Sequence, residues 1–305
     1  MIMRQTPQPS YLKIRSILFV AATIISGFTL TPSAYADDAT VLRLGIVSFL
    51  SGPAAGPFGV PAANAAKMMV DALNAGHVPS PYEARGIAGA QVEAIMVDEA
   101  GGVTKQVIEF RNMIQRRGVD VVIGYISSGS CLGIAPVAEE MKVLTVFHTC
   151  GTPRIFEEGN YRYVFRTASH SAMDGIGAAR YLIDRFPDLQ TYAGINQNYA
   201  WGHDSWRDFE GALRILKPDL QFKTHQLPKL FAGQYNAEIS ALLVSRSEAI
   251  HSSLFGGDLE AFTFQATARA LFQSAAGSLD DRFVRFGTKV LVESLQFNLV
   301  ALEES

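Results

Sequence analysis

The sequence predicts an α/β protein built as two lobes, each with a mainly parallel sheet covered by helices. Short apolar runs such as residues 42–47 and 120–125 lack polar alternation, which is typical of strands that are buried on both faces. Amphipathic stretches of helical period, such as residues 104–116, separate these runs. The same alternation starts again near residue 163, so we expect two successive units of strands and helices.

The first unit is expected to hold four strands and three helices. Gly76 and Gly118 directly follow two of the helical stretches, at the position where a left-handed C-cap favours glycine. The predicted strands are residues 42–47, 91–97, 120–125 and 143–147, and the predicted helices are residues 62–74, 104–116 and 134–140.

The second unit repeats this pattern and shows no close sequence repeat of the first. Its predicted strands are residues 163–166, 191–195, 220–226, 251–255 and 283–286, and its predicted helices are residues 172–185, 205–216, 235–245 and 261–274. The expected organisation is a first lobe at 37–155, a hinge crossover at 156–168, a second lobe at 169–290 and a C-terminal tail at 291–305.

The first 36 residues differ from the rest and read as a secretory leader. Arg4, Lys13 and Arg15 form a basic start, and the apolar run at 17–28 is shorter than the roughly 20 residues that cross a bilayer. Ala34-Tyr35-Ala36 is a small-x-small cleavage pattern. We therefore expect a cleaved signal peptide at 1–36 and a periplasmic protein, with an uncleaved anchor as the alternative.

Composition excludes several classes of protein. The 305 residues are 48% hydrophobic and 18% charged, which supports a folded core and argues against disorder. The net charge of −3 lacks the basic footprint of a nucleic-acid binder, so no nucleic-acid partner is expected. The six histidines show no metal-ligand spacing, so no metal site is expected. Gly175-Ile176-Gly177 lacks the third glycine of a dinucleotide-binding loop, and no cofactor is expected.

Hydroxyl side chains follow two neighbouring strands at their carboxyl ends, where open parallel sheets bind ligands. Ser127 and Ser128 precede the third helix, and Thr149 and Thr152 follow the next strand. Hydroxyls and backbone amides at a helix start suit a carboxylate or another small anion. The alternative is that these residues only cap the helix.

The two cysteines, Cys131 and Cys150, follow the same two strands, so a disulfide between them is geometrically plausible. Two free thiols are the second possibility. The third is a catalytic Cys131, because residues 129–133 match G-x-C-x-G after a strand, with His148 and His203 downstream as bases.

Aromatic and acidic residues lie near the strand ends of the second unit. Tyr199 and Trp201 would form a stacking wall for an apolar ligand, or would simply pack on the lobe surface. Asp258 and Glu260 follow a strand end and either contact a ligand or cap a helix.

Four segments together resemble the type I periplasmic solute-binding proteins of the branched-chain amino acid ABC transporters, the leucine/isoleucine/valine-binding family. The resemblance covers roughly residues 40–290. The segments that carry it are Leu50-Ser51-Gly52-Pro53 with Phe58-Gly59; residues 122–128; Gly151-Thr152-Pro153 with Phe165-Arg166-Thr167; and Tyr199-Ala200-Trp201-Gly202 with Phe255-Gly256-Gly257.

The resemblance implies two Rossmann-like lobes with the ligand held between them. By similarity, Ser128 and the segment Thr149–Thr152, including Gly151, would hold the ligand carboxylate. Phe58 and Trp201 fall at aromatic-wall positions, and Asp258 stands where the family has a tyrosine. The chain departs from the family in two respects: Lys289 falls where amino-acid binders have a glutamate, and the first lobe is expected to be incomplete because family members continue further.

The predicted function is therefore that of a periplasmic binding component of an ABC importer, and not of an enzyme. We expect it to bind a small carboxylate-bearing solute (an amino acid, an amide or an aromatic acid), to act as a monomer and to deliver the solute to an inner-membrane permease. The alternatives are a thiol hydrolase that uses Cys131 with a histidine base, and a shortened sensory paralogue.

Overall fold

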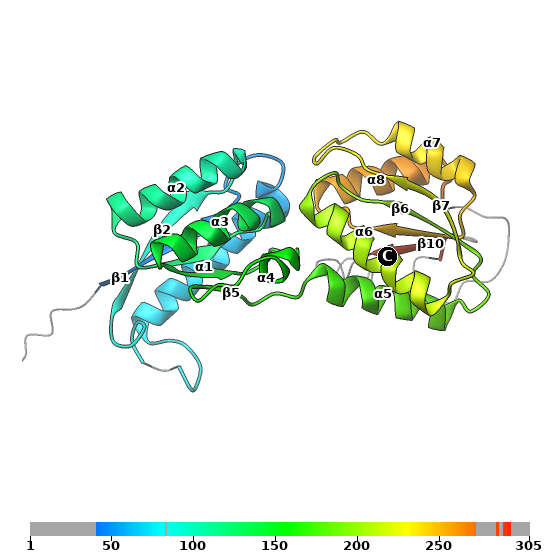
Figure 1. Ribbon diagram of the computed structural model, residues 1–305. Helices are drawn as coiled ribbons and strands as arrows, with labels where there is room; N and C mark the ends of the chain where they lie inside the picture. Colours follow the sequence, from blue (N-terminus) through cyan, green and yellow to red (C-terminus); the bar gives the residue numbers. More distant parts are fainter. Residues whose placement is uncertain (1–40, 83, 273–284, 287–288, 294–305) are drawn as a thin grey trace, which may run out of the picture. The chain divides into compact units, whose positions relative to one another are not determined.

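A computed structural model of the chain describes residues 41–82, 84–272, 285–286 and 289–293. These residues form two five-stranded sheets, each made from its own stretch of sequence (Figure 1). The α/β fold with parallel sheets predicted from the apolar runs is confirmed. The predicted leader at 1–36 and the tail from residue 294 lie outside the described residues.

The first sheet is parallel throughout, with the strand order β2-β1-β3-β4-β5. The elements of this lobe, in chain order, are β1 (Val41–Ser48), η1 (Ala55–Gly59), α1 (Val60–Ala75), β2 (Gln91–Asp98), α2 (Gly102–Arg117), β3 (Val121–Gly124), α3 (Ser128–Met141), β4 (Leu144–Phe147), α4 (Arg154–Glu157) and β5 (Val164–Arg166).

Local sequence explains where the helices of the first lobe end. Gly76 and Gly118 follow α1 and α2 with φ of 72° and 63°, a left-handed conformation that glycine adopts without a Cβ penalty. The side chain of Asn74 donates to the carbonyl of Val92 and accepts from its amide, both at 2.8 Å. This pair fastens the end of α1 to β2.

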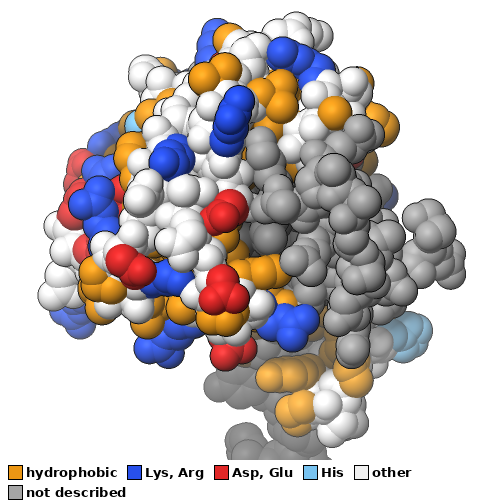
Figure 2. Space-filling model, turned by 90° about the vertical axis from the view of Figure 1, so that its right-hand side faces the viewer, with side chains coloured by type: hydrophobic (Ala, Val, Ile, Leu, Met, Phe, Trp, Pro, Cys, Tyr) orange, Lys and Arg blue, Asp and Glu red, His pale blue; other side chains and the backbone are white. Residues whose placement is uncertain are grey.

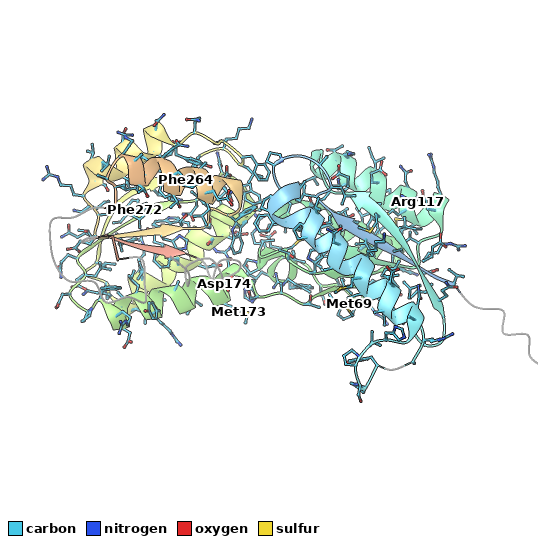
Figure 3. All side chains as sticks on the ribbon, turned by 180° about the vertical axis from the view of Figure 1, so that it is seen from behind. Met69, Arg117, Met173, Asp174, Phe264 and Phe272 are labelled. Atoms are coloured by element: carbon cyan, nitrogen blue, oxygen red, sulfur yellow. A yellow bond between two sulfur atoms is a disulfide. The ribbon has the colours of Figure 1, made fainter. Side chains whose placement is uncertain are left out.

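Helices cover the two faces of the first sheet unequally. The α2 and α3 face holds the main core, with buried Phe110, Tyr125 and Phe147. On the other face α1 packs over β1 and β2, and α1 lies behind the sheet in Figure 1 and in front of it in Figure 3. Leu144 and Phe165 point to this second face by strand alternation and are 40% and 51% exposed. Apolar side chains of the described first lobe are therefore exposed on this face, beside α1.

The second sheet has the order β7-β6-β8-β10-β9 and is parallel except for β9, which runs antiparallel to β10. The elements of this lobe, in chain order, are α5 (Ser171–Arg185), β6 (Thr191–Ile195), α6 (Ala200–Leu216), β7 (Gln221–Gln226), α7 (Asn236–Ser245), β8 (Ala249–Ser252), α8 (Gly257–Ala268), β9 (Arg285–Phe286) and β10 (Lys289–Glu293).

Two apolar clusters hold the second lobe, one on each face of its sheet. Helices α5 and α6 pack together over a cluster that contains Tyr192 and Phe209. Helices α7 and α8 cover the other cluster, where Phe272 is 1% exposed. Phe264 lies on the outer face of α8 and is 79% exposed, in contrast to Phe272 (Figure 3). None of the helices in the described part combines the length and apolar character that a bilayer crossing requires.

The structure differs from the predicted organisation at several boundaries. β5 pairs with β4, so residues 164–166 are the edge strand of the first sheet, within the stretch 156–168 expected as the crossover. β10 extends through residues 291–293, which were assigned to the tail. β8 ends at Ser252 instead of residue 255, because the chain turns toward Gly256 to start α8.

Candidate functional site

The residues that the sequence singled out lie at the carboxyl ends of the strands. In the first lobe these loops are residues 49–54 after β1, 125–127 after β3 and 148–153 after β4. In the second lobe they are residues 196–199 after β6 and 253–256 after β8. These are the edges where parallel α/β sheets place their ligands.

Helix α3 begins earlier than predicted, at Ser128 instead of residue 134. Ser127 is its N-cap: the residue is extended, and its Oγ accepts a hydrogen bond from the amide of Ser130 at 3.5 Å. The capping role considered for this serine is therefore present, and the first turn of α3 points its amides toward the strand-end edge.

A buried carboxylate that the sequence analysis did not select lies beneath this helix start. Glu99 is 1% exposed and accepts hydrogen bonds from the amides of Ile126 at 2.7 Å and Ser127 at 2.8 Å. Burial raises the pKa of Glu99 to about 7, against the lowering effect of the two amides. The available signal was its place directly after the apolar run of β2.

Ser128 and Thr152 are brought together and joined to the second lobe. Both are buried, and the amide of Thr152 donates to the Oγ of Ser128 at 3.2 Å. The hydroxyl of Thr152 donates in turn to Asp204 of α6 at 2.5 Å. Arg207 of α6 lies 3.5 Å from Asp204 and 3.6 Å from Glu157 of α4. The two predicted hydroxyls thus belong to a polar chain that connects the lobes.

The loop after β4 is fastened at both ends. Arg166 of β5 donates to the carbonyls of Cys150 at 3.2 Å and Thr152 at 2.7 Å. The carbonyl of Gly151 accepts from the amide of Ser171 at 2.8 Å. The hydroxyl of Thr149 is hydrogen-bonded to the Nδ1 of His148. The loop therefore holds a fixed backbone path beside the start of α3.

A disulfide joins Cys131 of α3 to Cys150 of this loop, with the two Cα atoms 6.4 Å apart. Both residues are fully buried. A bonded Cys131 has no thiolate to attack a substrate, so the thiol hydrolase has no support from the structure.

Four rings meet at the strand ends. The centroid of Phe255 lies 5.3 Å from that of Phe58 and 6.4 Å from those of Tyr199 and Phe231. Burial and the nearby carboxylates of Glu99 and Asp258 raise the pKa of Tyr199 well above its ordinary value, so its hydroxyl stays protonated. Phe231 and Phe255 were not selected from the sequence, although Phe255 belongs to a segment that carried the resemblance.

Trp201, predicted as a wall, lies deeper. Trp201 is only 6% exposed, and its Nε1 donates to the carbonyl of Ser253 at 3.1 Å. Trp206 stacks on His225 with centroids 4.3 Å apart, inside the second lobe. The tryptophans therefore support the loops after β6 and β8, while the phenylalanines and Tyr199 form the surface.

Asp258 fixes the second-lobe loops from below. It is 2% exposed, and its Oδ2 accepts from the Nε2 of Gln197 at 2.7 Å and from the amide of Phe231 at 2.8 Å. Phe231 has a φ of 59°, a left-handed conformation that costs energy for an aromatic residue and is held here by this hydrogen bond. Asp258 thus positions one of the four rings.

Glycine is required at position 256, where the backbone passes close to Phe58. Gly256 has a φ of 54°, and a Cβ built on it would lie 2.6 Å from the ring of Phe58 and 3.1 Å from Pro57.

Among the described residues, no group of histidine, cysteine and acidic side chains could hold a metal ion. The side chain of Lys289 lies outside the described set.

Comparisons with known proteins agree with this architecture. A family model described as periplasmic binding protein matches residues 41–282. The Leucine-, isoleucine-, valine-, threonine-, and alanine-binding protein of Pseudomonas aeruginosa is 27% identical over 242 residues, which are 78% of this chain and 58% of that protein. The Leu/Ile/Val-binding protein BraC3 of Rhizobium johnstonii is 26% identical over 78% of this chain and 66% of its own length. The chain thus spans roughly three fifths to two thirds of these relatives.

Solved structures show the same fold. The solute-binding protein of an ABC transporter from R. palustris, in complex with benzoate, superposes with a TM-score of 0.66 at 18% identity, over 76% of this chain and 60% of that chain. A branched-chain amino acid substrate-binding protein from Streptococcus pneumoniae, in complex with isoleucine, gives 0.65 at 15% identity, over 76% of this chain and 62% of that chain. The chain belongs to the periplasmic binding protein family, as its resemblance to the leucine/isoleucine/valine-binding proteins predicted.

Proposed function

We propose that this protein is the solute-binding component of an ABC importer and captures a small carboxylate-bearing solute between its lobes. The observation that carries this proposal is the meeting of two kinds of surface at the strand ends. The first lobe offers the amide-rich start of α3, and the second lobe offers rings that reach Phe58. An anion site beside an apolar wall suits a small organic acid.

The candidate ligand residues fall into two groups. Ser127, Ser128 and the loop Thr149–Thr152 would surround the carboxylate, and Phe58 and Tyr199 would contact the body of the solute. Asp258 and Trp201 support this site from below through their hydrogen bonds. Lobe closure would bend the short crossover between β5 and α5.

The protein would work in the periplasm and pass its solute to an inner-membrane permease without chemical change. The leader pattern at 1–36 and the Cys131–Cys150 disulfide both suit an oxidising compartment outside the cytoplasm. Figure 2 shows charges of both signs interspersed over the described part of one face. A monomer is expected to be sufficient for binding.

A thermal-shift screen of the purified chain tests the function. Amino acids, amides and aromatic acids are added singly, and the methyl ester of each acid serves as its control. A true solute raises the melting temperature, because saturation at about 100 Kd stabilises the folded state by about 2.7 kcal/mol, and the ester has a smaller effect. No shift with any solute, or equal shifts with acid and ester, would contradict the proposal.

A further inference from the structure

Glu99 is a buried acid that shares the start of α3 with the candidate solute site. It lies in the loop between β2 and α2 and is 1% exposed. Its Oε2 accepts from the amide of Ile126 at 2.7 Å, and its Oε1 accepts from the amide of Ser127 at 2.8 Å. Both amides belong to the segment that leads directly into α3. Glu99 therefore already occupies part of the amide-rich helix start that the proposed function assigns to the solute.

Two further amides lie at the same helix start. Ser128 and Gly129 are the first residues of α3, and the first amides of a helix have no acceptor within the helix. The amide of the third residue, Ser130, donates to the Oγ of Ser127. A solute carboxylate held by the amides of Ser128 and Gly129 would lie beside the amides that Glu99 holds. The helix start would then carry two carboxyl groups on consecutive residues.

The described groups that face Glu99 do not compensate its negative charge. The neighbouring carboxylate of Asp98 adds repulsion to the effect of burial, and the hydroxyl of Ser130 is the nearby side-chain donor. Tyr125 and Tyr199 stay protonated, because burial and the charge of Glu99 raise their pKa values. When two carboxyl groups share one site, one of them takes up a proton. Since its surroundings already disfavour the ionised form, Glu99 is the one of the two that does so.

We propose that Glu99 takes up a proton from the solvent when the solute carboxylate binds, so that capture of the solute is coupled to protonation. The inference rests on the proposed function, which brings the carboxylate to α3. Glu99 is a positioning residue, because it acts on the solute through the amides of α3. The proton goes to a carboxylate oxygen of Glu99, and no bond of the solute changes.

The coupling makes the affinity depend on pH in a defined direction. Burial raises the pKa of Glu99 in the free protein to about 7, so Glu99 is already protonated at pH 5.5. Above pH 7 the carboxyl group must first take up its proton, and that requirement weakens binding. We expect the affinity for a carboxylate to fall by about fivefold or more between pH 5.5 and 8.5.

Isothermal titration calorimetry on the full chain counts the protons. The probes are benzoate, 4-methylpentanoate and L-leucine, each titrated at pH 5.5 and 7.5 in two buffers with different heats of ionisation. The difference in binding heat between the buffers gives the number of protons taken up. We expect about 0.5 proton per bound probe at pH 7.5 and less than about 0.1 at pH 5.5. Benzamide, which has no carboxylate, is the control for benzoate and should cause no uptake.

A pair of variants assigns the proton to Glu99. Glu99→Gln keeps the size of the side chain and removes its titration, so uptake at pH 7.5 should fall below about 0.1 and the affinity should vary less than about twofold with pH. Glu93→Gln is the matched control, because Glu93 also belongs to the β2 segment but is exposed and pairs with Arg43 at 3.3 Å. It should keep the uptake of the wild type. The melting temperatures of the free variants verify their folds, and the wild-type titrations decide the inference even where Glu99→Gln does not fold.

The outcomes separate the inference from the function on which it rests. Binding of a probe without proton uptake at pH 7.5 would overturn the inference and leave the importer function standing. Undiminished uptake in Glu99→Gln, or equal uptake with benzamide, would overturn it as well. Absence of binding by all three probes overturns the inference, and absence of any shift in the wider solute screen removes the function too.

Discussion

Thr152 donates a 2.5 Å hydrogen bond to Asp204, across 52 positions of sequence and from the first lobe to the second. The donor lies in the loop after β4, and the acceptor lies in the first turns of α6. Because both groups are buried and the acceptor is a carboxylate, this bond belongs to the stronger class of side-chain hydrogen bonds. It ties the loop after β4, which is a candidate for binding the solute carboxylate, directly to the second lobe.

Thr152→Val should therefore weaken solute binding by about tenfold, mainly through faster release, since a hydrogen bond to a charged group contributes about 1.5–3 kcal/mol. Stopped-flow release of the bound solute measures this. Thr145→Val is the matched control: Thr145 is equally buried on β4, but its hydroxyl donates to the carbonyl of Val143. Similar release rates for the two variants would show that the interlobe bond is not used in binding.

Glu99 gives the protein a component of stability that depends on pH. Its pKa is raised from about 4.5 to about 7, so the folded state holds this proton more tightly than the unfolded state. The stabilisation is complete below pH 4.5 and is lost as the pH rises toward 7, to the extent of roughly 3 kcal/mol. Asp98, Tyr125 and Tyr199 face the same carboxyl group.

Urea denaturation of the wild type and of Glu99→Gln across this range measures the effect. The variant loses one acceptor for the two amides, a cost that does not depend on pH. The difference in unfolding free energy between the two proteins should change by roughly 3 kcal/mol between pH 4.5 and 7. The unfolding free energy of the wild type should fall relative to that of the variant as the pH rises. Parallel curves would mean that Glu99 keeps an ordinary pKa in the folded protein.

His251 has a buried imidazole ring that takes no part in the candidate site. It stacks on Phe209 with centroids 4.2 Å apart, and neither ring nitrogen has a hydrogen-bond partner. Burial, followed by the neighbouring His225, lowers its pKa to about 3, so its contribution to stability is lost as the pH falls from about 6.5 toward 3.

His251→Phe should raise the unfolding free energy by about 1–3 kcal/mol at neutral pH, because it removes unpaired buried polar atoms and keeps the stacked ring. The gain should grow as the pH is lowered to 5. Denaturant titrations at both pH values give these numbers, with the exposed His203→Phe as the control. A destabilised His251→Phe protein would indicate that the imidazole nitrogens have partners in solution.

Trp201→Ala should act through folding and should lower the affinity for large and small solutes alike. The indole is buried and donates to the carbonyl of Ser253, so its removal should cost about 3–5 kcal/mol of unfolding free energy. Denaturation and calorimetry on one preparation compare the two effects. Unchanged stability with a selective loss of bulky solutes would instead place Trp201 in contact with the ligand.

The strands and helices were predictable because local patterns specify them. The apolar run of β3 and the glycines after α1 and α2 act within a few residues, and the structure follows them closely. The start of α3 was missed because Ser127, Ser128 and Gly129 read as a loop, whereas a serine cap begins the helix at that position. β5 was assigned to the crossover because only its pairing with β4 reveals its sheet.

The sequence could predict which polar residues lie at the strand ends, but not what those residues contact. The rule that ligands lie at the carboxyl ends of strands brought Ser128, Thr152 and Asp258 to notice. Their partners could not be predicted, because Asp204 and Gln197 are distant in sequence and become neighbours only through tertiary packing. Glu99 was overlooked because an acid after a strand usually faces water, and only the structure places it beneath the amides of α3.

The close approach of Phe58 to Gly256 limits which substitutions position 256 can accept. Any side chain at position 256 would place a Cβ 2.6 Å from the ring and would also have to adopt a positive φ. Every single-base change in a glycine codon that alters the amino acid introduces a larger residue or a stop. No single-base change at codon 256 therefore gives a residue that fits. A missense mutation there would push the aromatic surfaces of the two lobes apart.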